Sequence, residues 1–600
     1  MTNTQAIQIT QPRDTVEVHL PDGRVLRGPR NAPIEVFFKV LENLDPTAPD
    51  FIGKGIQVYE QEIEQQTVKP PVVGAIINHE LRELTFPIRM DSTVRPVTMG
   101  DADGMRIYRR SLTFLLETSF EKLFPEAMLT IDHSVASGGY YCQVSGRPPL
   151  SEEELQKLED CMRDYVHQNL PFKRMEVPLE EAIEYFRSAR SEDKVRLLVH
   201  RHKNYLTLYQ LDDHRDYHHG YMLPSTGYLR WFGLAKTGDG FTLRFPRRHA
   251  PITLLPLPDY PTLLNTFLQY GDWLQKLGIS SVGALNDAIQ NNRAREVILV
   301  SEALHEQRVS EIAAQIANRR DQVRVVLIAG PSSSGKTTFS KRLAIQLLAY
   351  GVDPFPMEMD NYFVDRERTP RDENGEYDFE ALEALDRESM SSDLKRLIAG
   401  EEVRLPRYNF MTGKREAGET VQLQAGQIII LEGIHGLNPR LLPSMPTEQA
   451  FRIYVSALTQ LNLDRHNRVS TTDTRLIRRI TRDARERGYT AQITIQRWES
   501  VRRGEKRHIF PYQENADVMF NSALAYEISA LKPFAEPLLR QVPFGTPEYV
   551  EAKRLLAFMD WFLPLEGDLV PDNSILKEFL GSSILKYFRL WQNGYKGKPD

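Results

Sequence analysis

The chain has 600 residues, 41% of them hydrophobic, which is more than one hydrophobic core accommodates, so three or four domains are expected. Lys and Arg number 75 against 81 Asp and Glu, and this net charge of −6 gives no overall electrostatic case for a nucleic-acid ligand. The only cysteines, Cys142 and Cys161, lie far apart and support neither a disulfide framework nor a thiolate zinc site. Residues 1–13 lack an apolar signal core and no long apolar run occurs, which predicts a cytoplasmic protein without membrane spans.

The first 100 residues read as a small β-rich unit. Residues 16–20 alternate apolar and polar side chains as a strand does, residues 21–23 supply a turn, and residues 33–44 are expected to form a helix. Segments 20–23 and 73–78 resemble the TGS domain, a ubiquitin-like β-grasp fold found in threonyl-tRNA synthetases and some GTPases. The resemblance implies an adaptor that binds RNA or nucleotide.

Residues 101–250 resemble the α+β domain that accompanies TGS in threonyl-tRNA synthetases. The matching segments follow in the expected order, namely 110–116, 170–172, 180–183 and 224–227. In that family an H-x-x-x-H pair and a C-x-x-x-H pair line an editing pocket. Here Arg110, Phe114, His218 and Met222 stand at those four positions. Because neither guanidinium nor phenyl binds metal, we expect a degenerate site without zinc and without editing.

Several other polar residues of this region invite a functional interpretation. His214, His218 and His219 are clustered, but no carboxylate or thiolate stands at ligand spacing, so solvated or hydrogen-bonded surface histidines are favoured over a metal site. His133 and Cys142 are expected to be packing residues rather than a base and a nucleophile.

Helical periodicity continues beyond residue 250. Apolar residues recur at three- and four-residue spacing over 262–277 and 297–319, so residues 251–320 are expected to be a helical linker. A further domain is expected over residues 321–545, and residues 546–600 are expected to form helices that pack on the body of the protein.

The most specific motif lies at residues 325–338, where an apolar strand runs into a complete G-x-x-x-x-G-K-T phosphate loop. Its glycines let the backbone approach phosphate oxygens, and the amides that open the next helix donate to them. Lys336 can reach the β- and γ-phosphates, and Thr337 can ligate Mg²⁺. The expected ATP-binding residues are Gly330, Pro331, Ser332, Ser333, Ser334, Gly335, Lys336, Thr337 and Thr338.

Two later strands end in acidic residues. Asp360 follows the strand-like residues 354–359, and open α/β proteins place their chemistry at this end of a sheet, so Asp360 is the expected general base. A helix N-cap is the alternative role for Asp360. Glu432 ends the apolar run 427–433 as a Walker B acid does, and it is expected to hold magnesium directly or through water.

Arginines recur every three or four residues over 473–488, so several share one helix face. Such a face is usually solvated and salt-bridged. Beside a phosphate loop, the interpretation we favour is a lid that closes over ATP and binds its phosphates through Arg482 and Arg487.

Residues 324–539 resemble the uridine kinase and phosphoribulokinase family. The motifs that carry the resemblance are 330–338, 360–363, 377–386, 406–410, 431–433 and 478–488. It implies that Asp360 is the catalytic base and that Asp378 holds ribose hydroxyls. The acceptor-binding residues implied are Tyr362, Asp378, Tyr408, Phe410, Arg479 and Gln496.

The chain departs from this family where base specificity is set. Pyrimidine nucleoside kinases place a base-reading His where this chain has Gly413, and Tyr489 replaces a family Arg. Lys414 or Arg415 is a candidate substitute donor. The order of the three modules resembles bacterial nucleoside kinase or uridine kinase-like fusion proteins.

The sequence therefore predicts a multidomain protein of α/β and α+β class with an ATP- and Mg²⁺-dependent kinase in its second half. The expected acceptor is the 5′-hydroxyl of a ribonucleoside, and a kinase of another sugar or small alcohol is the alternative. The rival from another class is a nucleotide-switched module that binds RNA or the ribosome. A switch needs no hydroxyl-orienting acids, so Asp360 and Asp378 together favour the enzyme. RNA binding by the N-terminal domains and homo-oligomerisation are left open.

Overall fold

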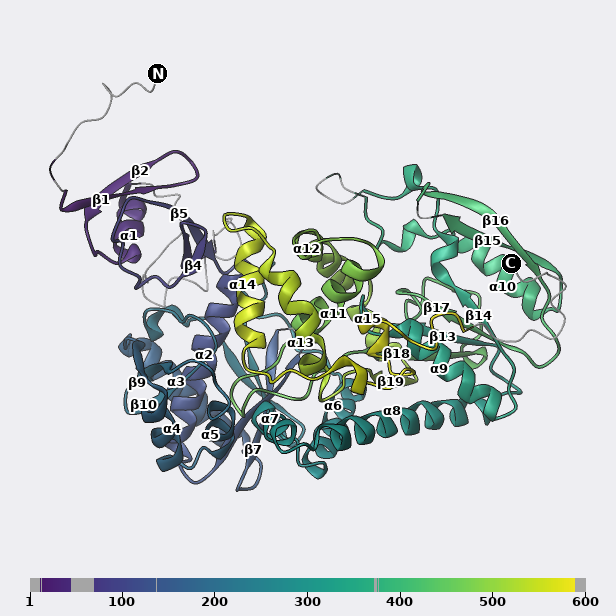
Figure 1. Ribbon diagram of the computed structural model, residues 1–600, viewed down its shortest axis with the longest axis horizontal. Helices are drawn as coiled ribbons and strands as arrows, with labels where there is room; N and C mark the ends of the chain where they lie inside the picture. Colours follow the sequence, from purple (N-terminus) through teal and green to yellow (C-terminus); the bar gives the residue numbers. More distant parts are fainter. Residues whose placement is uncertain are drawn as a thin grey trace, which may run out of the picture. The chain divides into compact units, whose positions relative to one another are not determined.

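The computed structural model describes residues 11, 13–44, 70–135, 138–371, 375, 377–409 and 411–588. They divide into two compact units. The first comprises residues 1–258, 465–468 and 543–550, and the second comprises residues 259–464, 469–542 and 551–600, in each case as far as they are described. Figure 1 labels the helices and strands of both. None of the helices in this described part combines the length and apolar character that a membrane span requires.

The first unit contains a five-stranded mixed sheet in the order β2-β1-β5-β3-β4. Its central strands β1 and β5 run parallel, and the other pairs are antiparallel. Helix α1 (Ile34–Leu44) packs on it through Phe37 and Phe38, which join Val16 and Val18 in one core. The strands are β1 (Thr15–His19), β2 (Val25–Pro29), β3 (Val72–Ile77), β4 (Glu80–Arg82) and β5 (Ser92–Thr98). This is the predicted β-grasp fold, and the predicted first strand and helix are confirmed.

A second core of the same unit surrounds the long helix α2 (Ala102–Leu123), whose buried side chains include Leu112 and Phe114. Two antiparallel sheets accompany it, in the orders β11-β12-β7-β6 and β10-β9-β8. Their strands are β6 (Met128–Val135), β7 (Gly139–Ser145), β8 (Lys173–Pro178), β9 (Tyr205–Leu211), β10 (His214–Asp216), β11 (Gly233–Thr237) and β12 (Gly240–Arg244). The further helices are α3 (Glu152–Gln168), α4 (Leu179–Ser188) and α5 (Glu192–Leu198). The predicted α+β class is confirmed.

The second unit is built on a parallel sheet of five strands in the order β14-β17-β13-β18-β19. The central strand β13 is completely buried, as its sequence VVLIA requires. The strands are β13 (Val325–Ala329), β14 (Pro354–Glu358), β17 (Ile428–Glu432), β18 (Ala450–Ser456) and β19 (Val518–Asn521). The carboxyl ends of β13, β14 and β17 therefore lie side by side, which brings residues 330, 360 and 432 to one edge.

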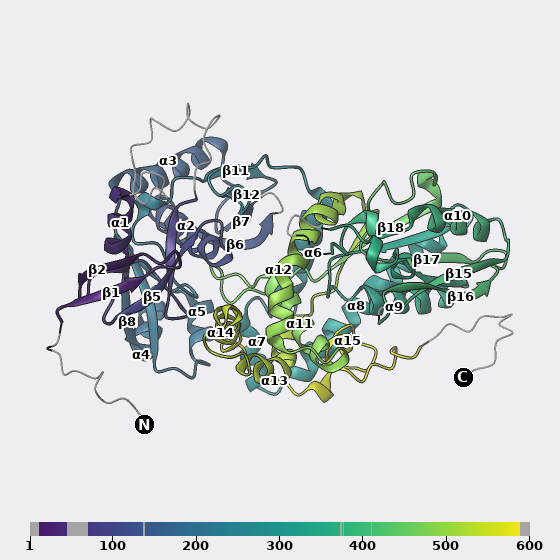
Figure 2. The same cartoon turned by 90° about the horizontal axis from the view of Figure 1, so that it is seen from above.

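Helices α8 (Ala294–Ala317) and α9 (Lys336–Ala349) pack together and on this sheet, as both views show (Figures 1 and 2). Helix α6 (Pro261–Lys276) contacts β19, and α7 (Val282–Gln290) contacts α8. The region expected to be a helical linker thus lies, from residue 259 onward, in the same compact unit as the sheet.

The second unit also contains a two-stranded hairpin and further helices. They include the hairpin β15 (Val403–Asn409) and β16 (Lys414–Val421), with α10 (Arg387–Ile398), α11 (Thr471–Glu486), α12 (Ala491–His508), α13 (Glu527–Arg540) and α15 (Lys577–Leu580). Helix α14 (Pro547–Met559) starts in the first unit and ends in the second. Short 3-10 turns cover Met359–Tyr362, Arg366–Arg368, Leu382–Ala384, Thr447–Gln449, Phe510–Asn515 and Gly567–Leu569.

Candidate active site

The phosphate loop joins β13 to α9 and is shaped by close backbone approaches. A Cβ atom on Gly330 would overlap the carbonyl oxygen of Val455, so only glycine fits there. Ser333 and Gly335 have φ values of 58° and 86°, in the left-handed region. The hydroxyls of Ser333 and Ser334 are buried and have no hydrogen-bond partner among the described residues. A loop with buried, unpartnered donors at the start of a helix is suited to bind an anion.

Lys336, Thr337 and Glu432 lie at the mouth of this loop. The Lys336 ammonium donates to the Pro331 carbonyl oxygen at 3.3 Å, and the Thr337 hydroxyl donates to the Glu432 carboxylate at 3.1 Å. Burial raises the pKa of Glu432 to about 7, while nearby Lys336 acts in the opposite direction. The hydroxyl and carboxylate oxygens are hard ligands, and a cation beside them would stabilise the charged form of Glu432. The donor set therefore fits Mg²⁺.

Asp360 lies at the end of β14, in the turn Met359–Tyr362. The surrounding protein raises its pKa to about 6, mainly by desolvation, with Lys336 lowering it and Glu358 raising it. The residue is nevertheless accessible to solvent, so an acceptor can reach its carboxylate. The N-cap residue of this turn is Glu358, and no side chain caps the turn with a hydrogen bond, so Asp360 does not serve as the N-cap of this turn.

A further carboxylate, Glu380, is influenced by the charges of this centre. Glu380 is acted on by the charges of Lys336, Arg479 and Asp360, and burial raises its pKa to about 7. Its Oε2 atom is buried and has no hydrogen-bond partner among the described residues. The Glu380 side chain lies against Gly504 of α12. A Cβ atom at position 504 would overlap it, so glycine leaves the space that Glu380 occupies.

Asp378 has a different environment. Its Oδ1 accepts the Glu380 backbone N–H at 3.1 Å, and its Oδ2 is 3.8 Å from His508 Nε2. Hydrogen bonding to His508 lowers the pKa of Asp378. Both residues belong to one motif, and their carboxylates have different surroundings.

The other residues expected to bind the acceptor differ in their burial and in their contacts. Tyr362 must be corrected: it is buried in the core and its hydroxyl donates to Asp393 at 3.0 Å, so that hydroxyl already has an internal partner. Tyr408 packs edge-on against Phe363, with ring centroids 5.6 Å apart, and its backbone N–H donates to Asn361 next to Asp360. Gln496 is exposed on α12, and Phe410 lies outside the described residues.

The arginine-rich helix is α11, and its arginines have three kinds of partner. Arg475 and Arg478 are fully buried and pair with Glu505 and Glu527, so they are structural. Arg479 donates to the Ser332 hydroxyl of the phosphate loop at 2.8 Å.

The two arginines expected to bind phosphate, Arg482 and Arg487, share a single carboxylate with Arg479, which was expected to bind the acceptor. Arg479, Arg482 and Arg487 lie 3.3, 3.1 and 3.3 Å from Asp483, which is buried. Three cations around one anion leave a net positive charge beside the phosphate loop, as the lid hypothesis requires.

The space beside Gly413 is filled by a neighbouring side chain. The Arg366 side chain covers it so closely that a Cβ atom there would lie 2.8 Å from the guanidinium carbon, and φ at Gly413 is 70°. The Arg366 backbone N–H also donates to the Gly413 carbonyl at 2.8 Å. Arg415 instead donates to Asp386 at 2.6 Å, and Lys414 is exposed. The side chain beside Gly413 is therefore that of Arg366, 47 residues away in the chain.

In the first unit, the pocket expected to be degenerate is filled by packing. Phe114 contacts Phe172, His214 and His218, and Met222 is buried. The Arg110 guanidinium donates to the Tyr221 carbonyl.

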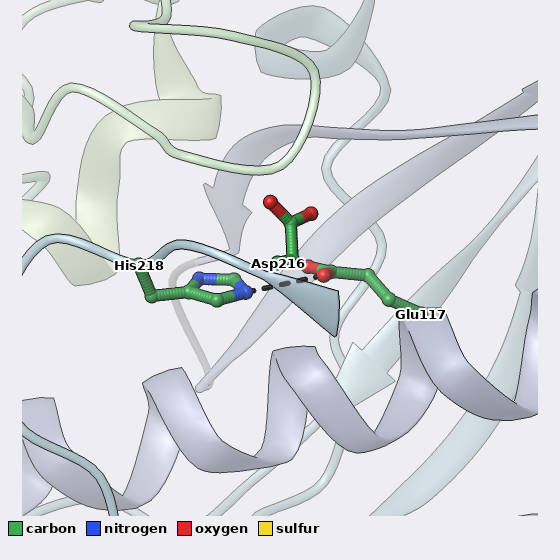
Figure 3. Close-up of side chains that lie close together, drawn as sticks. All are labelled: Glu117, Asp216 and His218. Atoms are coloured by element: carbon green, nitrogen blue, oxygen red, sulfur yellow. Dashed lines mark hydrogen bonds and ion pairs between the residues drawn. The ribbon is translucent and has the colours of Figure 1, made fainter. Parts of the chain in front are cut away.

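The histidine cluster beside this pocket is not a solvated surface feature, which corrects the sequence analysis. His218 is buried and lies 3.1 Å from Glu117, and Figure 3 shows its ring directed at that carboxylate with Asp216 alongside. Among the described residues these three form the one group whose ligand atoms all lie within 4.8 Å of each other. The Lys194 ammonium binds both oxygens of Asp216, at 2.7 and 2.5 Å, and thus supplies a cation from the protein itself. His133 and Cys142 are buried in packing roles, as expected.

A family model matches the part of the chain that contains this site. A model described as "Phosphoribulokinase / Uridine kinase family" matches residues 325–529, the span that contains the phosphate loop, Asp360, Glu432 and α11. The second unit carries a kinase domain of this family. Its match begins at β13 and ends within α13, so it covers the complete parallel sheet.

Curated relatives match the other part of the chain. Threonine–tRNA ligases from Desulforamulus reducens and Thermotoga maritima are 28% and 31% identical over 180 and 182 residues, each covering 30% of this chain. The enzyme from Laribacter hongkongensis is 33% identical over 166 residues. The chain spans only about a quarter of the length of these relatives, 28%, 28% and 26%. A region homologous to threonine–tRNA ligases thus precedes the kinase-family domain.

Solved structures with partial similarity include a putative fructose transport system kinase from Silicibacter sp. TM1040, with 17% identity, a TM-score of 0.25, and coverage of 35% of this chain and 98% of that chain. A possible uridine kinase from Bacillus stearothermophilus has 21% identity, a TM-score of 0.20, and coverage of 34% and 99%.

Proposed function

We propose that the protein transfers the γ-phosphate of ATP to a hydroxyl group, with the 5′-hydroxyl of a ribonucleoside as the favoured acceptor. The observation that carries the proposal is the convergence of Lys336, Thr337, Asp360 and Glu432 on the edge of one sheet next to the phosphate loop. A kinase needs these groups together, whereas a nucleotide switch needs no carboxylate that is open to an acceptor.

The roles follow from the chemistry of each side chain. Asp360 orients the attacking hydroxyl and accepts its proton, and a pKa of about 6 leaves the base mostly ionised at neutral pH. Lys336 follows the charge of the transferred group, and the phosphate-loop amides hold the remaining phosphates. The arginines on α11 bind phosphate when the lid closes.

For the acceptor, Glu380 replaces Asp378 in the proposal. Its unpartnered buried oxygen can accept a hydrogen bond from a substrate hydroxyl. Tyr408 offers an aromatic wall, and Arg366 offers the donors that Gly413 lacks.

Thr337 and Glu432 are the proposed magnesium ligands. When bound, Mg²⁺ neutralises phosphate charge. Because burial raises the pKa of Glu432 to about 7, we expect magnesium binding to release protons near neutral pH.

The test is release of ADP from MgATP across a panel of ribonucleosides, their 2′-deoxy forms, sugars and small alcohols. Asp360→Asn is the matched variant, because it removes the base and keeps the size of the side chain. We expect a steep loss of kcat with ATP affinity preserved. Turnover at the wild-type rate in this variant would contradict the role of Asp360, and absence of turnover with every acceptor would favour the nucleotide-switch alternative.

For the first unit, we propose binding of structured RNA without deacylation. Support comes from the homology to threonine–tRNA ligases and from the filling of the degenerate pocket by Phe114 and Met222. Metal analysis and a deacylation assay with mischarged tRNA test the proposal, which expects neither stoichiometric zinc nor hydrolysis. The domain boundaries at about residues 100, 250, 320 and 545, a cytoplasmic location and homo-oligomerisation stay predictions.

A further inference from the structure

Residues 574–586, which include α15, lie on the phosphate-loop side of the kinase domain and are called the strap below. Ile575, Leu576 and Phe579 are fully buried, so the strap is packed into the domain rather than resting on its surface. Both views place α15 beside α11 (Figures 1 and 2).

The strap places a carboxylate on the start of α9. The Thr338 backbone N–H and the Thr338 hydroxyl both donate to Oε2 of Glu578, at 3.3 and 2.8 Å. Thr338 is the third residue of α9, so this N–H is one of the helix donors that have no intrahelical partner. These are also the donors that a phosphate loop offers to a nucleotide.

A hydrophobic contact accompanies this hydrogen bond. Ile575 lies against Gly335, where its Cγ2 atom would be 2.5 Å from an added Cβ atom. The side chain thus fills the space above the last glycine of the loop. Ile575 thus lies against Gly335 of the loop, and Glu578, three positions later in the chain, accepts the two hydrogen bonds of Thr338.

The strap also ties the two nucleotide-binding helices together. Lys341 of α9 donates to the Leu585 carbonyl at 2.7 Å. Arg485 of α11 donates to the carbonyls of Phe579 and Glu578, at 2.6 and 2.8 Å. Motion of α11 over a nucleotide would therefore break or rearrange these contacts.

Glu505 is a second carboxylate at the phosphate loop, and its surroundings differ from those of Glu578. Glu505 accepts from the Ser332 backbone N–H at 3.1 Å, but it is fully buried and pairs with Arg475 and Arg502. Two arginines make Glu505 a fixed part of the loop. The partners described for the Glu578 side chain are the two donors of Thr338, and it is only partly buried, so it can leave without stranding a buried charge.

We infer that the strap is autoinhibitory and that Glu578 competes with the phosphates of the nucleotide for the start of α9. The inference rests on the proposed function, since it assumes that the loop binds ATP. A triphosphate and a fixed carboxylate at one N–H repel each other, so the strap must withdraw before the nucleotide binds. The apparent dissociation constant is then the intrinsic one divided by the fraction of molecules in which the strap is open.

The test compares the full-length protein with Glu578→Gln and with Glu566→Gln, which removes the same charge at an exposed position just before the strap. Affinity for a non-hydrolysable ATP analogue with Mg²⁺ is measured by calorimetry without acceptor. A strap closed in nine molecules of ten predicts affinity about tenfold tighter in Glu578→Gln. The control variant should bind as the wild type does.

Hydrogen exchange supplies a measurement that needs no kinase activity. Without nucleotide, we expect slow exchange over residues 574–586 in the wild type and faster exchange in Glu578→Gln. Adding the analogue should accelerate exchange of the same residues in the wild type. Unchanged or weaker affinity in Glu578→Gln would overturn the inference, because Glu578 would then be neutral toward the nucleotide or part of its site. If no version bound nucleotide, the proposed function would fail, and the exchange result would still decide whether Glu578 holds the strap on α9.

Discussion

The pH at which activity falls on the acid side should depend on Glu358, a charged residue that has no proposed contact with the substrate. Asp360 works as a base only when ionised, so activity falls as the pH drops through its pKa of about 6. Desolvation is the main cause of this raised pKa, Lys336 opposes it, and the like charge of Glu358 adds to it. Glu358→Gln removes that like charge, which lowers the pKa of Asp360 and moves the acid limb to lower pH.

The expected shift can be estimated from the strand geometry. Glu358 is the last residue of β14 and Asp360 lies two residues later in the turn, so their Cα atoms are within two extended steps of ~3.3 Å, and we take a carboxylate separation on the order of 7 Å. Coulomb's law with the dielectric constant of water gives ~0.6 kcal/mol at that distance, and 1.36 kcal/mol corresponds to one pKa unit. Because both residues are accessible to solvent, we expect a shift of about 0.4 pH unit at low salt and less at high salt.

The assay is kcat/KM for the best acceptor between pH 5 and pH 8 at saturating MgATP and at two ionic strengths. Glu388→Gln, an exposed substitution on α10, is the matched control and should leave the limb in place. A profile without an acid limb in this range would refute Asp360 as the base. A limb that moves upward in Glu358→Gln would refute the electrostatic reasoning.

Three further substitutions give distinct outcomes. Lys336→Ala should lower kcat by at least about 10²-fold and leave the circular dichroism spectrum unchanged, because its described contact is one hydrogen bond to the phosphate loop; wild-type turnover would contradict the assignment. Lys194→Met should destabilise the protein by about 1–3 kcal/mol in denaturant unfolding because it removes the ammonium that pairs with the buried Asp216 and leaves that carboxylate with His466 and the Tyr217 backbone N–H, whereas Arg187→Met at an exposed pair should cost less than about 0.5 kcal/mol. Equal losses in these two variants would show that burial does not decide the cost. Gly330→Ala should lower the melting temperature and abolish nucleotide binding, since the new methyl group would overlap a backbone carbonyl; normal binding would mean that the loop can move aside.

The sequence predicted the parts of the site that are contiguous in the chain. The phosphate loop, Asp360 and Glu432 each follow a recognisable strand, and parallel strands bring their carboxyl ends together. Ribose binding by Asp378 stays a prediction, and the sequence does not distinguish Asp378 from Glu380 because the two carboxylates stand two residues apart in one motif.

The remaining features depend on contacts that no local pattern encodes. Glu578 contacts Thr338 across 240 residues of chain, and Asp216 lies beside Glu117 although no motif joins these two residues. The histidine cluster seemed to lack carboxylate partners because those partners come from α2 and β10. Hydrophobic periodicity predicts which face of an element is buried, but it does not predict which polar side chain arrives from elsewhere to meet it.

The packing of Arg366 on Gly413 restricts how this chain could acquire a different base preference. A histidine introduced at position 413 would meet the Arg366 side chain and would also need a left-handed backbone. The two positions are therefore coupled, and the order of change matters. Shortening Arg366 first opens the space, whereas changing Gly413 first creates a clash. Library designs that vary these positions one at a time would miss the combinations that accommodate a side chain at position 413.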